Sequence, residues 1–199
     1  MRTLLAITCS ATLTLLLAFQ FGCNRQSANQ TGNQNSDTNT AVQKYFGKIK
    51  AQAETLNQAS IRGDYATAAD LTHPKLIEFV GGREQYMAML NDTRAEMLAE
   101  QVQLLSATVD PPTQILEAGN QIHAVVPVTW RMKVTDGVLV GRAYMIGVSE
   151  DRGENWKFVS APGEQLDPQQ LKALFPAAAD KLQIPASEQP ALERSSPSP

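Results

Sequence analysis

Apolar residues follow a helical spacing in the first half of the chain and a strand alternation in the second half. From Thr40 onward they recur every three or four positions, which places them on one face of a helix. They are Val42, Tyr45, Phe46, Ile49, Ala53, Leu56 and Ala59. Gly63 ends this predicted helix. Asp64 is placed to cap a second helix, residues 65–71, because its carboxylate can accept from free N–H groups of the first turn.

A third helix is predicted further along the chain. Pro74 suits the first position of a helical turn that runs through Phe79, and a Gly81-Gly82 pair then breaks the chain. Residues 83–99 carry apolar and polar side chains with helical spacing: Tyr86, Met89, Leu90, Thr93 and Met97. The pattern therefore predicts three helices before the first strand.

Strands occupy the second half. Residues 102–109, 113–118, 122–134 and 156–161 have extended patterns, and 122–134 alternates most strictly. Its even positions are apolar, and its odd positions carry His123 and Arg131 among others. Such alternation is typical of an antiparallel sheet with one buried face and one face in water. We therefore expect His123 to be exposed.

Asp136-Gly137 predicts a tight two-residue hairpin after that strand. This turn would pair Trp130 with Ala143, Met132 with Gly141 and Val128 with Met145. Small residues on the second strand would then face large ones on the first. Arg131 would face Arg142, an unfavourable pair. Pro127 has no N–H for the ladder and should lie at an edge or a bulge.

The stretch SEDRGENW, residues 149–156, has the spacing S-x-D-x-G-x-x-W and resembles the Asp-box of sialidase-type β-propellers. A propeller needs at least four blades of four strands, and the sequence contains no second copy and no repeat of 40–50 residues. The motif therefore predicts a compact turn, in which Asp151 accepts backbone N–H groups and Gly153 takes a positive φ. A glycan-hydrolase function is excluded.

The N-terminus has the pattern of an export signal. Met1-Arg2 is followed by an uncharged stretch through Gly22 that is rich in Leu and Ala. Gly22-Cys23 resembles the lipobox of bacterial lipoproteins, in which the Cys becomes the lipid anchor, although Gln20 and Phe21 depart from that pattern. The alternative is an uncleaved anchor, because ~20 apolar residues can span a bilayer. Both interpretations predict an extracytoplasmic, membrane-anchored domain.

The expected organisation follows from these boundaries. Residues 1–22 are the signal peptide, 23–40 the lipidated Cys and a flexible polar linker, and 41–162 the folded domain. Residues 163–184 form a C-terminal extension whose short helix starts at the capping sequence Asp167-Pro168-Gln169-Gln170. Residues 185–199 are expected to be a disordered tail.

Composition narrows the function classes. The net charge is −3, without a Lys/Arg cluster, which argues against nucleic acid as a partner. Cys9 and Cys23 are the two cysteines, so a disulfide framework is excluded for the domain. With His73 and His123 as its histidines and no Cys in the domain, a metal site has little support, and no cofactor is expected.

Helices followed by a long antiparallel sheet with small residues on its inner face indicate an α+β fold. The stretch GDYATAADLTHPKLIEFVGG, the third predicted helix, and the strands through GRAYMIGVSEDRGENWKFV resemble the NTF2-like (SnoaL-like) family, over about residues 40–162. This resemblance implies a cone in which a curved, mostly antiparallel sheet wraps around three N-terminal helices and leaves a pocket. The fold hosts dehydratases, isomerases and cyclases as well as non-catalytic binders.

In catalytic members an Asp, His or Tyr inside the cone acts on a small apolar substrate. His73 is the catalytic candidate, because a pKa near 6.5 suits proton transfer. The alternative is a loop residue whose ring hydrogen-bonds the backbone. Candidates for lining a ligand pocket are Tyr65, Tyr86, Trp130 and Met145, with core packing as the alternative for each.

Two functions stay open at this stage. The first is a membrane-tethered, non-catalytic module that binds a small apolar ligand or an envelope protein. The second is a small dehydratase- or isomerase-like enzyme that uses His73 with a pocket tyrosine, Tyr86 or Tyr144. A homodimer through the outer sheet face is a further option, although Arg131, Lys133 and Arg142 make that face an awkward interface.

Overall fold

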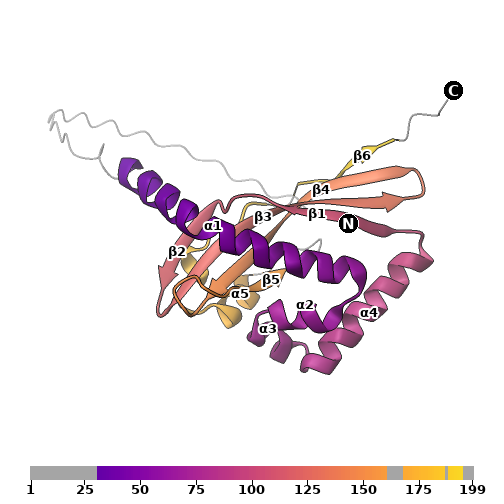
Figure 1. Ribbon diagram of the computed structural model, residues 1–199, viewed down its shortest axis with the longest axis horizontal. Coiled ribbons are helices and arrows are strands. Elements are labelled where there is room, and N and C mark those ends of the chain that lie inside the picture. Colours follow the sequence, from indigo (N-terminus) through magenta and orange to yellow (C-terminus); the bar gives the residue numbers. More distant parts are fainter. Residues whose placement is uncertain (1–30, 161–167, 187, 195–199) are drawn as a thin grey trace, which may run out of the picture.

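The computed structural model describes residues 31–160, 168–186 and 188–194. Its architecture is α+β, with helices packed against an antiparallel sheet that curls into a half-barrel (Figure 1). The predicted signal peptide, residues 1–22, and the predicted anchor Cys23 lie outside the described residues. Within those residues, no helix is long and apolar enough to cross a membrane.

The long helix α1 (Thr31–Arg62) has the predicted buried face. Its apolar positions at intervals of three and four are buried, namely Tyr45, Ile49, Ala53, Leu56 and Ala59. The helix begins at Thr31, inside the segment 23–40 for which the sequence predicts a linker. Once the amphipathic part has formed, each further residue adds a hydrogen bond at little cost, so the helix extends into residues 31–40.

Four helices precede the sheet in the described residues, so the expectation of three is not confirmed. After α1 come α2 (Tyr65–Leu71), α3 (Pro74–Phe79) and α4 (Arg83–Ala99). The Asp64 cap is confirmed, since its carboxylate accepts from Thr67 N–H at 3.2 Å. The predicted turn after Pro74 is a helix of its own, because His73 caps it and Pro74 fixes φ at its start.

The sheet is built on the pair β3 (Gln121–Val134) and β4 (Gly137–Ser149). β1 (Gln103–Val109) and β2 (Gln114–Ala118) pair in succession with the same edge of β3, and β5 (Lys157–Ser160) pairs with β4. The carbonyl of Pro127 accepts from Asp110 N–H at 3.0 Å, where the chain passes from β1 to β2. Pro127 therefore faces the place where ladder pairing is interrupted, which is the edge-like position its missing N–H requires.

The predicted hairpin register is wrong by two residues. Val134 pairs with Gly137, so the two loop residues are Thr135 and Asp136, and Gly137 follows with φ of 149°. Trp130 therefore faces Gly141 rather than Ala143, and Arg131 faces Val140 rather than Arg142. Because a shift of two preserves the alternation, every side chain keeps its predicted face while its partner changes.

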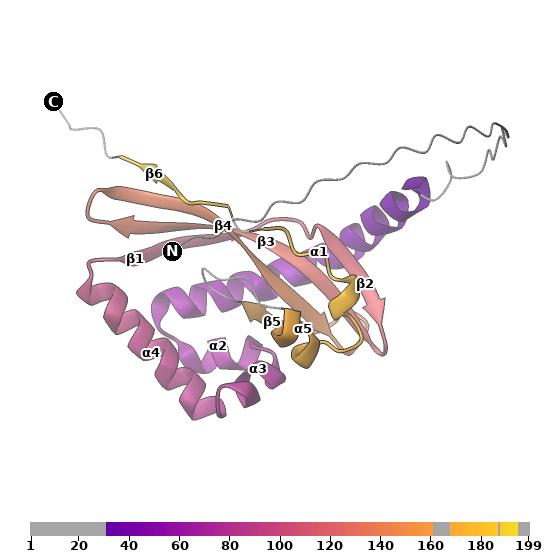
Figure 2. The same ribbon diagram turned by 180° about the vertical axis from the view of Figure 1, so that it is seen from behind.

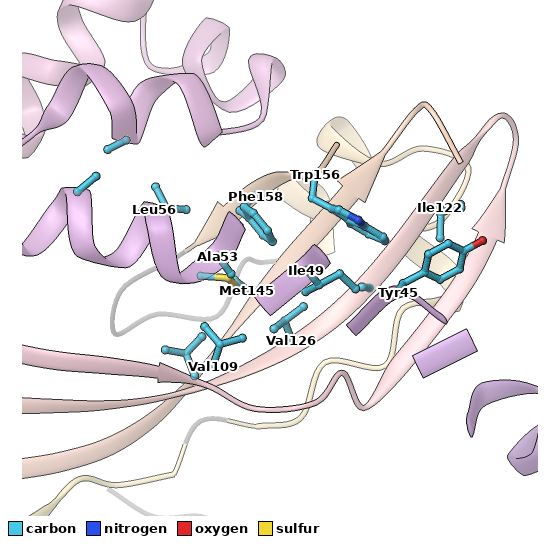
Figure 3. Packing of buried hydrophobic residues seen from close by; sticks show 14 residues of the cluster. Tyr45, Ile49, Ala53, Leu56, Val109, Ile122, Val126, Met145, Trp156 and Phe158 are labelled. Atoms are coloured by element: carbon cyan, nitrogen blue, oxygen red, sulfur yellow. The ribbon is translucent and has the colours of Figure 1, made fainter. Parts of the chain in front are cut away.

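One cluster of buried residues lies between α1 and the concave face of the sheet (Figure 3). Tyr45 and Ile49 of α1 point toward Trp156, Phe158 and Val126 of the sheet side. The Tyr45 and Trp156 rings meet edge to face with their centroids 6.0 Å apart. This arrangement is the inner core, and it places α1 against the concave face of the sheet.

The opposite face of the sheet is covered as well. Helix α5 (Pro168–Leu174) and the 3₁₀ helix η1 (Ala179–Lys181) pack on it and bury a second cluster (Figure 2). The expectation that this face lies in water is therefore wrong over half of β3, and His123 is buried rather than exposed. The alternation of β3 could not show this, because the covering residues lie some fifty positions further along the chain.

A short strand also forms inside the segment predicted to be a disordered tail. β6 (Ala191–Glu193) pairs with Val138–Val140 of β4. Glu193 makes a two-pronged ion pair with Arg131, with N–O distances of 2.6 and 3.2 Å. Arg142 pairs instead with Asp110 at 3.2 Å. Each arginine thus has an acidic partner within the chain.

The inner core predicts different effects for two alanines on α1. Ala53 is fully buried, so Ala53→Leu should overpack the core and lower the free energy of unfolding by about 1–3 kcal/mol. Ala51 is exposed on the same helix, and Ala51→Leu should change it by less than about 0.5 kcal/mol. Urea unfolding of both variants measures the difference. Equal effects would contradict the placement of α1.

Candidate functional site

The proposed pocket residues occupy separate places in the structure. Met145 belongs to the inner core and pairs with Val126, whereas Trp130 lies four residues further along β3, or about 13 Å along the strand. Trp130 is half-buried. Its ring lies over Gly141, where an added Cβ would come within 2.2 Å of the ring. Gly141 is thus the residue that lets this ring lie across β4.

The tyrosine candidates lie on the helices. Tyr65 is half-buried in the first turn of α2. Tyr86 is buried on α4, and its hydroxyl lies 3.0 Å from that of Thr72. Since Thr72 donates to Ala68 O at 2.9 Å, Tyr86 donates to Thr72 in turn. Burial raises the pKa of Tyr86. Its hydroxyl therefore remains protonated and ties α4 to the end of α2.

His73 is buried, with 5% of its surface exposed. Its backbone N–H donates to Phe158 O at 2.9 Å, and its Nδ1 accepts from Lys75 N–H at 3.3 Å. The ring packs edge to face on Phe175 at 5.5 Å. Burial, followed by the charge of Lys75, lowers the pKa of His73. The imidazole is therefore a neutral helix cap that hydrogen-bonds the backbone, as the alternative interpretation expects.

His123 is the residue that sequence reasoning missed. Only 1% of it is exposed, and neither ring nitrogen has a hydrogen-bond partner among the described residues. Its ring packs edge to face on Phe175 at 5.6 Å. Burial, followed by the proximity of His73, lowers the pKa of His123 to about 4. One signal could have revealed it: Leu171, Leu174 and Phe175 form an apolar cluster after the last strand of the domain and need a face to cover.

The fold thus brings both histidines against one aromatic ring. We call His73, His123 and Phe175 the histidine cluster. His73 comes from the start of α3, His123 from β3, and Phe175 from the residue after α5. Burial favours the uncharged form of an imidazole. Both imidazoles are buried in this arrangement, so water does not reach them to support a proton.

The S-x-D-x-G-x-x-W turn satisfies its polar groups internally. Asp151 accepts from Ser149 Oγ at 2.8 Å and from Asn155 N–H at 2.8 Å, while Gly153 N–H donates to Ser149 Oγ at 2.9 Å. Trp156 Nε1 donates to Gly153 O at 3.0 Å. The hydrogen bonds from Asn155, then that from Ser149, lower the pKa of Asp151 to about 2. The carboxylate is thus fully used in holding the turn.

Helix α1 anchors this turn from the other side. The side chain of Gln52 accepts from Trp156 N–H at 2.8 Å and donates to Glu154 O at 3.0 Å. Tyr45 lies against Gly153, where an added Cβ would come within 2.4 Å of its ring. The turn is therefore a junction between the sheet and α1, which agrees with the predicted structural role.

In the described part of the chain, no group of three His, Cys, Asp or Glu side chains is placed to hold a metal ion. The chain matches no protein-family model, no curated protein and no solved structure. The site must therefore be interpreted from its own geometry.

Two glycines, Gly153 in the turn and Gly47 in α1, should have opposite effects on stability when each is replaced by Ala. Gly153→Ala should lower the free energy of unfolding by about 2–3 kcal/mol, because φ is 89° and the new methyl group would collide with Tyr45. Gly47 is a helical glycine with nothing within 4 Å of an added Cβ, so Gly47→Ala should raise it by about 0.5–1 kcal/mol. Thermal unfolding of both variants tests this. A neutral Gly153→Ala would contradict the close contact.

Proposed function

We propose that this chain is a membrane-tethered, extracytoplasmic domain of the NTF2-like kind that binds a small apolar ligand or an envelope protein without catalysing a reaction. The support for the fold is the curled antiparallel sheet packed around α1, which is compatible with a cone. The support for the tether is the uncharged N-terminal stretch that ends in Gly22-Cys23.

The observation that carries the non-catalytic proposal is the filling of the concave face. Tyr45, Ile49 and Ala53 of α1 meet Trp156 and Phe158 there, and all of them are buried apolar or aromatic groups. The acid–base candidates are engaged elsewhere, because His73 caps α3 and Tyr86 bonds Thr72. A binding role needs no free acid–base side chain in this interior, whereas a reaction would.

The alternative remains a small dehydratase- or isomerase-like enzyme that uses His73 and a pocket tyrosine. One observation favours it: burial keeps His73 unprotonated at neutral pH, as a general base requires. Its contacts weigh against it, since Nδ1 already accepts from Lys75 and the ring lies against Phe175.

The net charge and the covering of the outer sheet face narrow the classes of partner that we propose. The net charge of −3 does not favour nucleic acid, and no cofactor is invoked. A homodimer through the outer sheet face would compete with residues 168–184 over the part of that face that these residues already cover. An envelope protein or a small apolar ligand is therefore the partner that we propose.

The tether can be tested with two cysteines. In cells grown with radiolabelled palmitate, Cys23→Ser should abolish the labelling of the chain, because the thiol that accepts the lipid is lost. Cys9→Ser changes a cysteine inside the signal stretch and should leave the labelling unchanged. Immunoprecipitation followed by autoradiography measures both. A wild-type chain that takes up no label yet stays in the membrane fraction would support an uncleaved anchor instead.

Binding and catalysis can be separated with the full chain purified in a mild detergent. Organic extraction and mass spectrometry should detect a retained apolar molecule, which stays unchanged on incubation with the protein. His73→Asn preserves a good helix cap and removes the imidazole. Conversion of the molecule by the wild-type chain but not by His73→Asn would establish the enzyme alternative.

A further inference from the structure

The interface between the C-terminal segment and the outer sheet face is apolar and is closed at both ends by hydrogen bonds. Residues 168–184, which we call the covering segment, pack with the sheet into one buried cluster, to which Leu174, Phe175, Ala178, Ile146, Val148 and Val159 belong. Lys75 Nζ donates to Leu174 O at 3.3 Å. At the other end, Gln114 donates to Lys181 O at 2.9 Å and accepts from Gln183 N–H at 2.8 Å.

The histidine cluster lies within this interface. Phe175 belongs to the covering segment, whereas His73 and His123 belong to the body of the domain, so both ring contacts cross the interface. His123 has no polar partner among the described residues for either nitrogen. A proton added to His123 would therefore place an unpaired cation against Phe175 and next to Val148 and Val125 of the sheet. Without water, such a buried charge is costly.

The surrounding charges do not offset that cost. Lys75 opposes protonation of His73, while Glu150 and Glu78 favour it more weakly, and His73 itself opposes protonation of His123. Lys157, on the outer side of β5, directs its ammonium group to Asp70 O. The charged side chains of the covering segment, Lys172, Asp180 and Lys181, are exposed.

We propose that residues 168–184 are an acid-released cover: at neutral pH the segment closes over two uncharged histidines, and on acidification the protonated histidines favour the state in which it has lifted from the sheet. Lifting admits water to both imidazoles and exposes the apolar outer face, including Ile146, Val148 and Val159. This inference is independent of the proposed function, because it concerns the opposite face from the inner core.

The direction of the pH dependence follows from the lowered pKa values. The open state binds a proton near pH 6.5 and the closed state only near pH 4, so closure is complete above about 6.5 and weakens as the pH falls from there toward 4. For His123 alone, the ratio of open to closed states should rise roughly 20-fold between pH 7 and pH 5. His73 adds to the same direction.

Hydrogen–deuterium exchange of the full chain at pH 7 and pH 5 tests the cover, after correction for the intrinsic exchange rate. The reporters are amides that hydrogen-bond within the segment: Phe175 to Leu171 O, Ala178 and Ala179 to Phe175 O, and Leu182 to Ala178 O. Their protection factors should fall roughly 20-fold at pH 5, while those of α1 stay constant. Equal protection at both pH values would overturn the proposal.

Two substitutions, combined in one double variant, test whether the histidines cause the effect. His123→Phe keeps an aromatic ring in the interface, and His73→Asn keeps the α3 cap, so the double variant should remain closed at pH 5. Loss of protection at pH 5 in this variant would sink the proposal. If the double variant does not fold, an NMR titration of the wild-type imidazoles decides. A His123 that gains its proton near pH 6.5 while the segment stays protected contradicts the cover, and proton uptake together with loss of protection supports it.

Discussion

The packing of α1 against the concave face of the sheet is the interaction on which the rest of the structure depends. Burying a large apolar side chain contributes about 1.5–3 kcal/mol, and Trp156, Phe158 and Ile49 are all buried at this one contact. Ala53 and Ala59 on the same helix face lack bulk and let the helix approach the strands closely. Two further helices are attached to α1: α2 packs directly on it, and Arg94 of α4 donates to Ile61 O at 2.7 Å.

The sheet is covered on two faces by segments from opposite ends of the domain. The inner face is closed by α1, which precedes every strand, and part of the outer face by residues 168–184, which follow β5. The first contact is large and includes two aromatic rings from the turn-to-β5 region. The second is smaller, and at its ends the side chains of Lys75 and Gln114 bond the backbone of the segment. It also contains two imidazoles that have no charge at neutral pH. The two covers therefore differ in how strongly acid disturbs them.

The S-x-D-x-G-x-x-W turn shows how one motif serves both local and tertiary structure. Its internal hydrogen bonds, from Ser149 and Asn155 to Asp151, explain the turn without any ligand. Its docking to Gln52 and Tyr45 fixes where α1 crosses the sheet. A motif that in another fold marks a repeated blade here holds a helix in place, which is why its presence carries no information about glycans.

The sequence by itself determined the local elements, because their signals lie within a few residues. The spacing of apolar side chains predicted the buried face of α1, Asp64 predicted the cap of α2, and the alternation of β3 predicted which side chains share a face. Tertiary structure decided the rest. The hairpin register depended on which two residues fit the loop, and both options preserve the alternation. The burial of His123 depended on Phe175, fifty-two positions away in the printed sequence, and a strand pattern records only that two faces differ, not what comes to cover them.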